Sequence, residues 1–201
     1  MERKDERKSA LRGKRVGVAI TGSFCTFDVA LSCIAELLVN GAEVQAILSF
    51  ATAGLDTKFG TAQGFKDKLA ILTGKPMIQT IPEAEPIGPG RLFDILLVLP
   101  ATGNTLAKLA AGIADTPAAM AVKSHLRNSG PVVLAVSSND ALGTGAKNIG
   151  HLLNANNVYF VPFGQDDPEV KPRSMVFKKE MVLAAVTEAL KGRQVQPILA
   201  M

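Results

Sequence analysis

The 201-residue chain is 47% hydrophobic and 20% charged, values that exclude a disordered or collagen-like protein and predict one globular domain. Its net charge of +4 arises within residues 1–15, which hold seven basic and three acidic residues, while the remainder holds 15 of each sign. Because there is no Trp and there are only ten aromatic residues, we do not expect a nucleic-acid-binding module, which would gather cations and stacking rings on one face.

Apolar runs and helical spacings alternate along the chain. Residues 16–20 form an apolar run typical of a buried strand, and residues 24–40 carry apolar side chains at helical spacing. The further expected elements are, in order, a strand at 44–50, a loop at 52–62, a helix at 63–72, a short edge strand at 77–81, a loop at 82–91, a strand at 93–99 that stops at Pro100, helices at 104–114 and 117–128, a strand at 131–136, a helix at 143–155, a strand at 157–161, a loop at 162–174 and a helix at 178–191.

Continuous apolar strands separated by helices predict a parallel sheet covered on both faces, which is a three-layer, doubly wound α/β domain. We assign this domain to residues 14–201 and a charged tail to residues 1–13. Residues 1–10 lack apolar periodicity, so we expect them to be dispensable for folding. No signal-peptide pattern and no run long enough to span a bilayer is seen, so we expect a cytoplasmic protein without membrane contact.

The two cysteines, Cys25 and Cys33, would lie about 12 Å apart on one helix, which is too far for a disulfide. We expect two buried thiols; the alternative is a Cys25 with thiolate character at a helix N-terminus. With only two histidines in the chain, no residue spacing is typical of a metal site, and we expect none. No pattern identifies a catalytic residue.

Doubly wound sheets bind ligands outside the carboxyl ends of their strands, which directs attention to three turns. In the first, Gly22 permits close backbone approach, and the hydroxyls of Ser23 and Thr26 flank a helix N-terminus that can hold an anion. The turn is neither a dinucleotide fingerprint nor a Walker loop. The alternative is that its hydroxyls only cap the helix. A phosphate would be repelled by Asp28 if that carboxylate faced the site.

The second turn, at residues 100–105, and the third, at residues 137–143, are also small and polar, and we expect all three turns to converge on one ligand. The candidate cofactor-binding residues are Thr21, Gly22, Ser23, Thr26, Ala101, Thr102, Gly103, Asn104, Thr105, Ser138 and Asn139.

The string Pro-Ala-Thr-Gly-Asn-Thr at residues 100–105 resembles the P-A-[ST]-A-N-T signature of the flavoprotein family, which includes flavin-containing cysteine decarboxylases and flavin prenyltransferases. Residues 21–23 match the family's first loop, and Asn139 matches the Asn of its P-x-M-N motif. The resemblance covers about residues 14–160. It implies a flavodoxin-like, Rossmann-like fold, bound FMN and a homo-oligomer.

The chain departs from the family pattern at several positions. Asp28 stands where the family commonly has Lys, Gly103 replaces Ala, and Ser138 replaces Met. Residues 49–75 contain no His, whereas the decarboxylases have a functional His there. We therefore do not expect cysteine decarboxylation.

The string Pro-Phe-Gly-Gln-Asp-Asp-Pro at residues 162–168 has no generic structural role, and with residues 84–89, 138–143 and 196–199 it resembles the B-subunit family of dipicolinate synthases. This resemblance implies a partner A subunit and a dihydrodipicolinate-level dicarboxylate that is converted to dipicolinic acid in sporulation. It favours NAD(P) on the partner rather than on this chain. The candidate substrate-binding residues are Gln165, Asp166, Asp167 and Arg173.

Two functions stay open on this basis. The chain is either an FMN-binding oxidoreductase subunit or a non-catalytic partner that keeps the fold, binds no cofactor and completes the A subunit's site. The carboxylate of Asp28 favours the second function, whereas the polar side chains of Thr102, Asn104 and Asn139 favour a retained ligand site.

Overall fold

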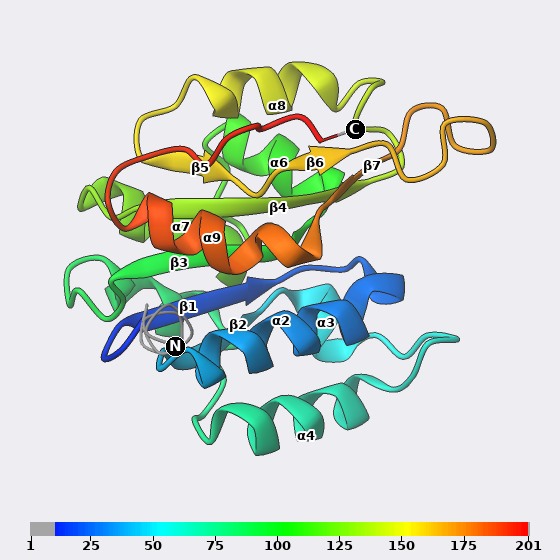
Figure 1. The fold of residues 1–201 in the computed structure, drawn as a ribbon. Helices are drawn as coiled ribbons and strands as arrows, with labels where there is room; N and C mark the ends of the chain where they lie inside the picture. Colours follow the sequence, from blue (N-terminus) through cyan, green and yellow to red (C-terminus); the bar gives the residue numbers. More distant parts are fainter. Residues whose placement is uncertain (1–10, 201) are drawn as a thin grey trace, which may run out of the picture.

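The computed structural model describes residues 11–200, and its centre is a twisted sheet (Figure 1). Five strands run parallel in the spatial order β2-β1-β3-β4-β5. This is the flavodoxin-like order, in which the direction of strand addition reverses between β1 and β3. The expected doubly wound α/β fold is confirmed. The strands are β1 (Arg15–Ile20), β2 (Glu43–Leu48), β3 (Ile95–Ala101), β4 (Val132–Ser138) and β5 (Val158–Phe160).

The sheet is mixed rather than purely parallel. The strand β7 (Met175–Phe177) pairs antiparallel with the end of β4, and β6 (Phe163–Gly164) pairs antiparallel with β7. The expectation of an all-parallel sheet and of a structureless loop at 162–174 is therefore wrong at this edge. These strands have only two or three residues and are stabilised by pairing with distant backbone, which no local pattern reveals.

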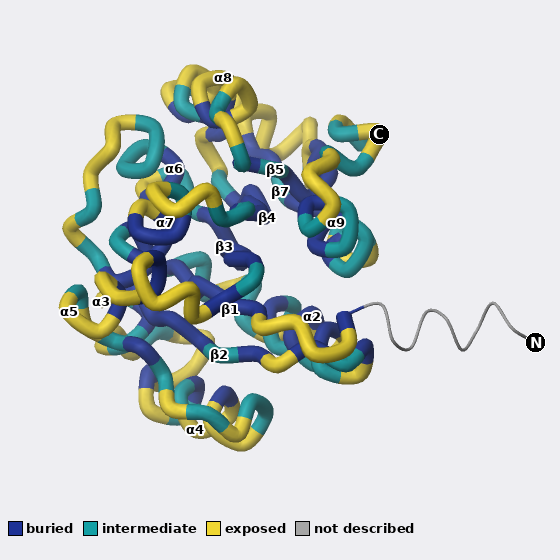
Figure 2. The backbone as a smooth tube through the Cα atoms, turned by 90° about the vertical axis from the view of Figure 1, so that its left-hand side faces the viewer, coloured by how far each residue is buried: buried dark blue, intermediate teal, exposed yellow. Residues whose placement is uncertain are grey.

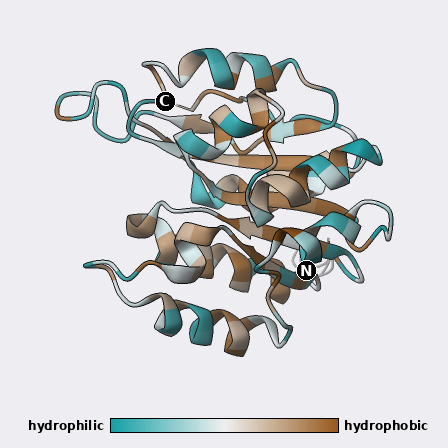
Figure 3. Ribbon diagram, turned by 180° about the vertical axis from the view of Figure 1, so that it is seen from behind, coloured by the Kyte–Doolittle hydropathy of each residue, from teal (hydrophilic) through white to brown (hydrophobic). Residues whose placement is uncertain are grey.

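Helices cover both faces of the sheet (Figure 1). One apolar cluster joins the strands to α2, α4 and α9, and a second joins them to α5, α6, α7 and α8. The strands are buried between helices whose outer sides are exposed (Figure 2), and the central strands are strongly hydrophobic (Figure 3). The helices are α2 (Phe27–Val39), α4 (Ala62–Thr73), α5 (Ile81–Ala84), α6 (Gly103–Ala110), α7 (Pro117–Arg127), α8 (Ala146–Leu153) and α9 (Val182–Ala189), with single 3-10 turns at Phe24–Thr26, Glu85–Ile87 and Lys179–Met181.

Two expected loops contain helices because side chains cap them. Helix α3 (Phe50–Gly54) overlaps the start of the loop expected at 52–62. Its first turn is capped by Ser49, whose Oγ accepts from the N–H of Thr52. The loop expected at 82–91 begins inside α5, where Thr80 and Glu83 form a reciprocal capping box. Such local hydrogen bonds stabilise one or two turns that are too short to show apolar periodicity.

Two expected strands also differ from the structure. The edge strand expected at 77–81 is reduced to a single parallel bridge between Ile78 and Ile47. Strand β3 does not stop at Pro100 but continues to Ala101, because the register between β3 and β4 shifts between Val98 and Ala101. The shift accommodates a residue that has no N–H for the ladder.

The described chain starts with a turn against the end of α2. Leu11 is fully buried, and its N–H donates to the carbonyl of Asn40 at 3.1 Å. Residues 1–10, which we expect to be dispensable for folding, lie outside the described residues. Within residues 11–200, no helix is long and apolar enough to cross a membrane.

The fold buries one imidazole without full hydrogen bonding. His125 on α7 is 4% exposed, and its Nε2 has no hydrogen-bond partner. The ring packs against Gly130, where a Cβ would lie 2.3 Å from Nε2. Burial lowers the pKa of His125, against smaller opposing effects of the Pro131 carbonyl and of Asp94.

This burial predicts loss of stability in mild acid. The unfolded chain protonates His125 near pH 6.5, whereas the folded chain protonates it only at lower pH. Below about pH 6.5 the unfolded state therefore binds more protons, and the free energy of unfolding falls as the pH falls. We expect a lower Tm at pH 5.5 than at pH 7.5, and a clearly smaller difference in His125→Leu. Equal pH dependence in both proteins would contradict this account.

Candidate functional site

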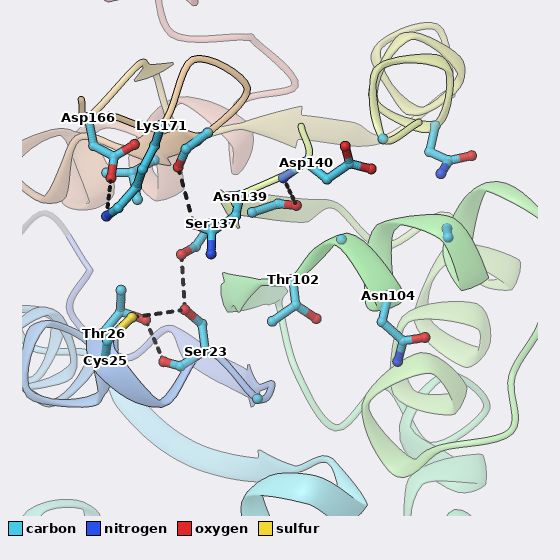
Figure 4. Close-up of a pocket in the computed structure, with 18 of the residues that line it drawn as sticks. Ser23, Cys25, Thr26, Thr102, Asn104, Ser137, Asn139, Asp140, Asp166 and Lys171 are labelled. Atoms are coloured by element: carbon cyan, nitrogen blue, oxygen red, sulfur yellow. Dashed lines mark hydrogen bonds and ion pairs between the residues drawn. The ribbon is translucent and has the colours of Figure 1, made fainter. Parts of the chain in front are cut away.

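A cavity of about 600 Å³ opens at the carboxyl ends of β1, β3 and β4 (Figure 4). Its position is the point where the strand order reverses, and its volume is typical of small-molecule sites. The three expected turns converge here, together with the segment before β7. The residues that carry most of its polar lining are Gly22, Ser23, Cys25, Thr26, Thr102, Gly103, Asn104, Ser137, Ser138, Asn139, Asp140, Thr144, Asn148, Asp166, Lys171 and Ser174.

The first and second turns are joined by a buried threonine. Thr21 Oγ1 donates to the carbonyl of Pro100 at 2.7 Å and accepts from the N–H of Thr102 at 3.2 Å. Thr21 is 1% exposed, and Ala101 beside it is fully buried. These two predicted site residues therefore do not line the cavity. Thr21 instead joins the two turns that do.

The hydroxyls of the first turn do not cap the helix. Neither Ser23 nor Thr26 accepts a side-chain capping bond at the start of its helix. Ser23 Oγ instead lies 3.1 Å from Ser137 Oγ, and Thr26 Oγ1 donates to the carbonyl of Ser23 at 2.7 Å. The capping alternative is thus wrong for both residues, and the first turn is linked to the end of β4.

The carboxylate of Asp28 does not face this cavity. Its side chain is 94% exposed, lies 3.9 Å from the ammonium of Lys68, and borders a separate cavity of about 260 Å³. Cys25 is exposed and lines the main cavity, so the expectation that both thiols are buried is wrong for Cys25. It is confirmed for Cys33, where burial raises the pKa of the thiol to about 11.

The second turn starts helix α6 at the cavity. Thr102 is the N-cap, its Oγ1 accepts from the N–H of Thr105, and the two hydroxyls lie 3.1 Å apart. The positive end of the α6 dipole therefore meets the cavity, an arrangement that favours anions. A Cβ on Gly103 would lie 2.7 Å from Ser138 Oγ, so the second and third turns approach closely here and a larger residue would displace the Ser138 hydroxyl.

A second cavity, of about 410 Å³, adjoins the other side of the α6 N-terminus. It shares Gly22, Thr102 and Asn104 with the main cavity. Thr105, which is 7% exposed and absent from the main cavity, lines this one together with Lys108. An elongated ligand can therefore contact both sides of the second turn.

The third turn contacts the segment that leads into β7. Asn139 Oδ1 accepts from Ser174 Oγ at 3.4 Å, and the N–H of Asp140 donates to Ser138 Oγ at 3.3 Å. Thr144 Oγ1 donates to the carboxylate of Asp140. The antiparallel pairing of Ser138 with Met175 creates this contact, and for that reason sequence reasoning missed Ser174.

The expected substrate residues divide into two groups. Asp166 lines the cavity, and its pKa is lowered, first by the hydroxyl of Ser174 and then by smaller effects that include Lys171. Gln165 Nε2 donates to the carbonyl of Pro172 at 2.9 Å, and Asp167 Oδ1 accepts from the N–H of Val170 at 3.0 Å, so both fold the loop itself.

Arg173 is the fourth expected substrate residue, and it does not line the cavity. Its carbonyl accepts from the N–H of Leu142 at 2.9 Å. The cation that does line the cavity is Lys171, which lies on the same loop as the four expected substrate residues but is not among them. Its place in the segment that follows the Gly-Gln-Asp-Asp-Pro string was the available signal.

Comparisons with known proteins agree with this geometry. A family model described as Flavoprotein matches residues 4–189. The B subunit of dipicolinate synthase from Bacillus subtilis (strain 168) is 43% identical over 191 residues, which cover 95% of this chain and 96% of that protein. The crystal structure of the corresponding B subunit from Bacillus halodurans C matches with a TM-score of 0.88 and 39% identity, over 95% of this chain and 98% of that one.

A more distant structure shares only the fold. DmrB of Burkholderia xenovorans, solved in complex with FMN, matches with a TM-score of 0.66 and 18% identity. The match covers 89% of this chain and 96% of DmrB.

Proposed function

The chain belongs to the flavoprotein family, and we propose that it acts as the B subunit of a dipicolinate synthase that converts a dihydrodipicolinate-level precursor to dipicolinic acid. The similarity to the B subunits of two dipicolinate synthases over nearly the whole chain supports this proposal. The observation that carries it is the convergence of three polar turns and the Asp166–Lys171 segment on one cavity of about 600 Å³. Two of these segments, the third turn and the loop that holds Asp166, belong to the strings through which the sequence resembles those B subunits.

The residues at this cavity fit FMN. The first turn presents Gly22 and the hydroxyl of Ser23, which caps no helix, to a phosphate. The positive end of α6 lies beside them. The small residues Thr102 to Thr105 border both cavities and leave room for a flat ring. Asp28, whose charge would oppose a phosphate, lies elsewhere. FMN would supply a hydride acceptor, which no side chain of this chain provides.

The chain's own residues then bind and orient the acid. A dihydropyridine dicarboxylate needs cations and hydrogen-bond donors for its carboxylates. The cavity is lined by the ammonium-bearing Lys171 and by the amide side chains of Asn139 and Asn148. We further propose that the chain forms a homo-oligomer, pairs with an A subunit that holds NAD(P), and works in the cytoplasm of sporulating cells.

A second function is favoured by the charge of the cavity. Among the described residues that line it, Asp140 and Asp166 outnumber the single cation Lys171, a poor balance for a flavin phosphate. On this view the chain keeps the flavoprotein fold, binds no cofactor and completes the A subunit's site.

Titration of the purified full chain with FMN separates the two functions. The first predicts saturable quenching of flavin fluorescence, with binding in the micromolar range or tighter. The absence of binding at high micromolar FMN would overturn the flavin-dependent function and favour the cofactor-free partner. Light scattering on the same sample tests the homo-oligomer, and a monomer would refute that part of the proposal.

A further inference from the structure

We infer that Lys171 is the residue with which this chain binds a carboxylate of its acid ligand, and that the second carboxylate is left to a cation of the partner protein. The inference rests on the proposed function and assigns the recognition of the dicarboxylate within it. It concerns this chain's own side chains and does not depend on whether FMN is bound.

Lys171 is the single Lys or Arg side chain that lines the main cavity among residues 11–200. Its Nζ lies 3.4 Å from Asp166 Oδ2, and its side chain is 51% exposed. A lysine ammonium has three donors. One donor directed at Asp166 leaves two that can reach a ligand in the cavity.

Hydrogen bonds within the loop fix the backbone of Lys171, and Asp166 orients its ammonium. The N–H of Lys171 donates to the carbonyl of Asp167 at 2.8 Å, and Asp167 Oδ1 accepts from the N–H of Val170 at 3.0 Å. Asp166, the partner of this ammonium, has a lowered pKa, chiefly through the nearby hydroxyl of the buried Ser174. A side chain that is already oriented loses less conformational entropy on binding.

Lys171 lies on the side of the cavity opposite the second turn. In Figure 4, Asp166 and Lys171 lie across the cavity from Thr102 and Asn104, at the turns proposed for the flavin. The acid ligand would therefore lie between the loop and the second turn, with one carboxylate on Lys171.

The charged side chains that line the cavity favour one ligand carboxylate over two. Once Lys171 is engaged, the remaining charged lining residues that the structure describes are the carboxylates of Asp140 and Asp166. A second ligand carboxylate would meet amide donors such as those of Asn139 and Asn148 but no second cation, and it would be repelled by both aspartates. The site therefore suits a monocarboxylate but lacks a cation for the second carboxylate of a dicarboxylate. Binding that second carboxylate is the role left to the partner.

The test is calorimetric titration of the full chain with pyridine-2,6-dicarboxylate and with pyridine-2-carboxylate at low salt. We expect Lys171→Met to weaken binding of both acids at least tenfold, consistent with the loss of a charge-assisted hydrogen bond. Lys171→Arg should retain most of the affinity. Lys147→Met is the matched control, because Lys147 is exposed on α8 and outside the cavity lining, and it should change affinity less than twofold.

The two acids test the partner's role. For the chain alone we expect affinities within about threefold of each other, and a preference of at least tenfold for the dicarboxylate once the A subunit is added. Unchanged binding in Lys171→Met would overturn the assignment while leaving the proposed function intact. A tenfold dicarboxylate preference by the chain alone would overturn the partner's share. If neither acid binds with or without the A subunit, both the proposed function and this inference fail.

Discussion

Replacing Ser23 with Asp is expected to weaken FMN binding about a hundredfold or more. Ser23 Oγ lies at the main cavity beside Gly22 and 3.1 Å from Ser137 Oγ. A carboxylate there would stand within a few ångströms of the flavin phosphate, and like charges about 4 Å apart repel by roughly 4 kcal/mol near a protein surface. Fluorescence titration with FMN measures the change.

Ser23→Asn is the control, because it adds nearly the same volume without the charge. We expect the factor by which FMN affinity falls in this variant to be less than a tenth of the factor seen with Asp. Equal losses in both variants would show that size, not charge, limits the site, and unchanged binding in both would place the phosphate elsewhere.

The Ser23→Asp variant also separates the two candidate functions. Mixed with the A subunit, it should form little dipicolinate if the chain works through FMN. Full dipicolinate formation by this mixture would instead support the cofactor-free partner, because in that function there is no flavin phosphate for the new carboxylate to repel.

Replacing Thr21 with Val is expected to lower the free energy of unfolding by about 2–4 kcal/mol. The exchange keeps the shape but leaves the buried carbonyl of Pro100 and the part-buried N–H of Thr102 without the Thr21 hydroxyl. Each unsatisfied buried group costs about 1–3 kcal/mol. At about 2–4 °C per kcal/mol for a chain of this size, Tm should fall by roughly 5–15 °C.

The same change should loosen the site, because Thr21 ties the first turn to the second. We expect weaker FMN binding in Thr21→Val, measured below its Tm, and near-normal binding and stability in Thr21→Ser, which retains the hydroxyl. A Thr21→Val protein as stable as the original would show that these bonds contribute nothing net.

Much of the fold and of the site could be predicted from local sequence patterns. The strands β1 to β5 are apolar runs bounded by turns, and their alternation with helices predicts the doubly wound sheet. Because parallel strands end at one edge, the three polar turns had to lie near one another. The convergence of Ser23, Thr102 and Asn139 on one cavity confirms that geometric argument.

The direction in which individual side chains point was decided only by the tertiary structure. Thr21 and Thr105 have the same polar character as Ser23 and Thr102, yet they are 1% and 7% exposed and turn toward neighbouring backbone and hydroxyls. Asp28 turns away into solvent. Composition and spacing report that a turn is polar, but the orientation of each side chain depends on contacts with other elements.

The five parallel strands, the main helices between them and the family could be predicted from the sequence alone, because apolar periodicity and motif strings are local properties of the chain. The tertiary structure decided that Lys171 and Ser174 belong to the site. They reach it through β7, a strand of three residues whose pairing with β4 joins positions 37 residues apart, Ser138 and Met175. Such pairing is stabilised by backbone hydrogen bonds that any side chains permit, and it therefore leaves no pattern in the sequence.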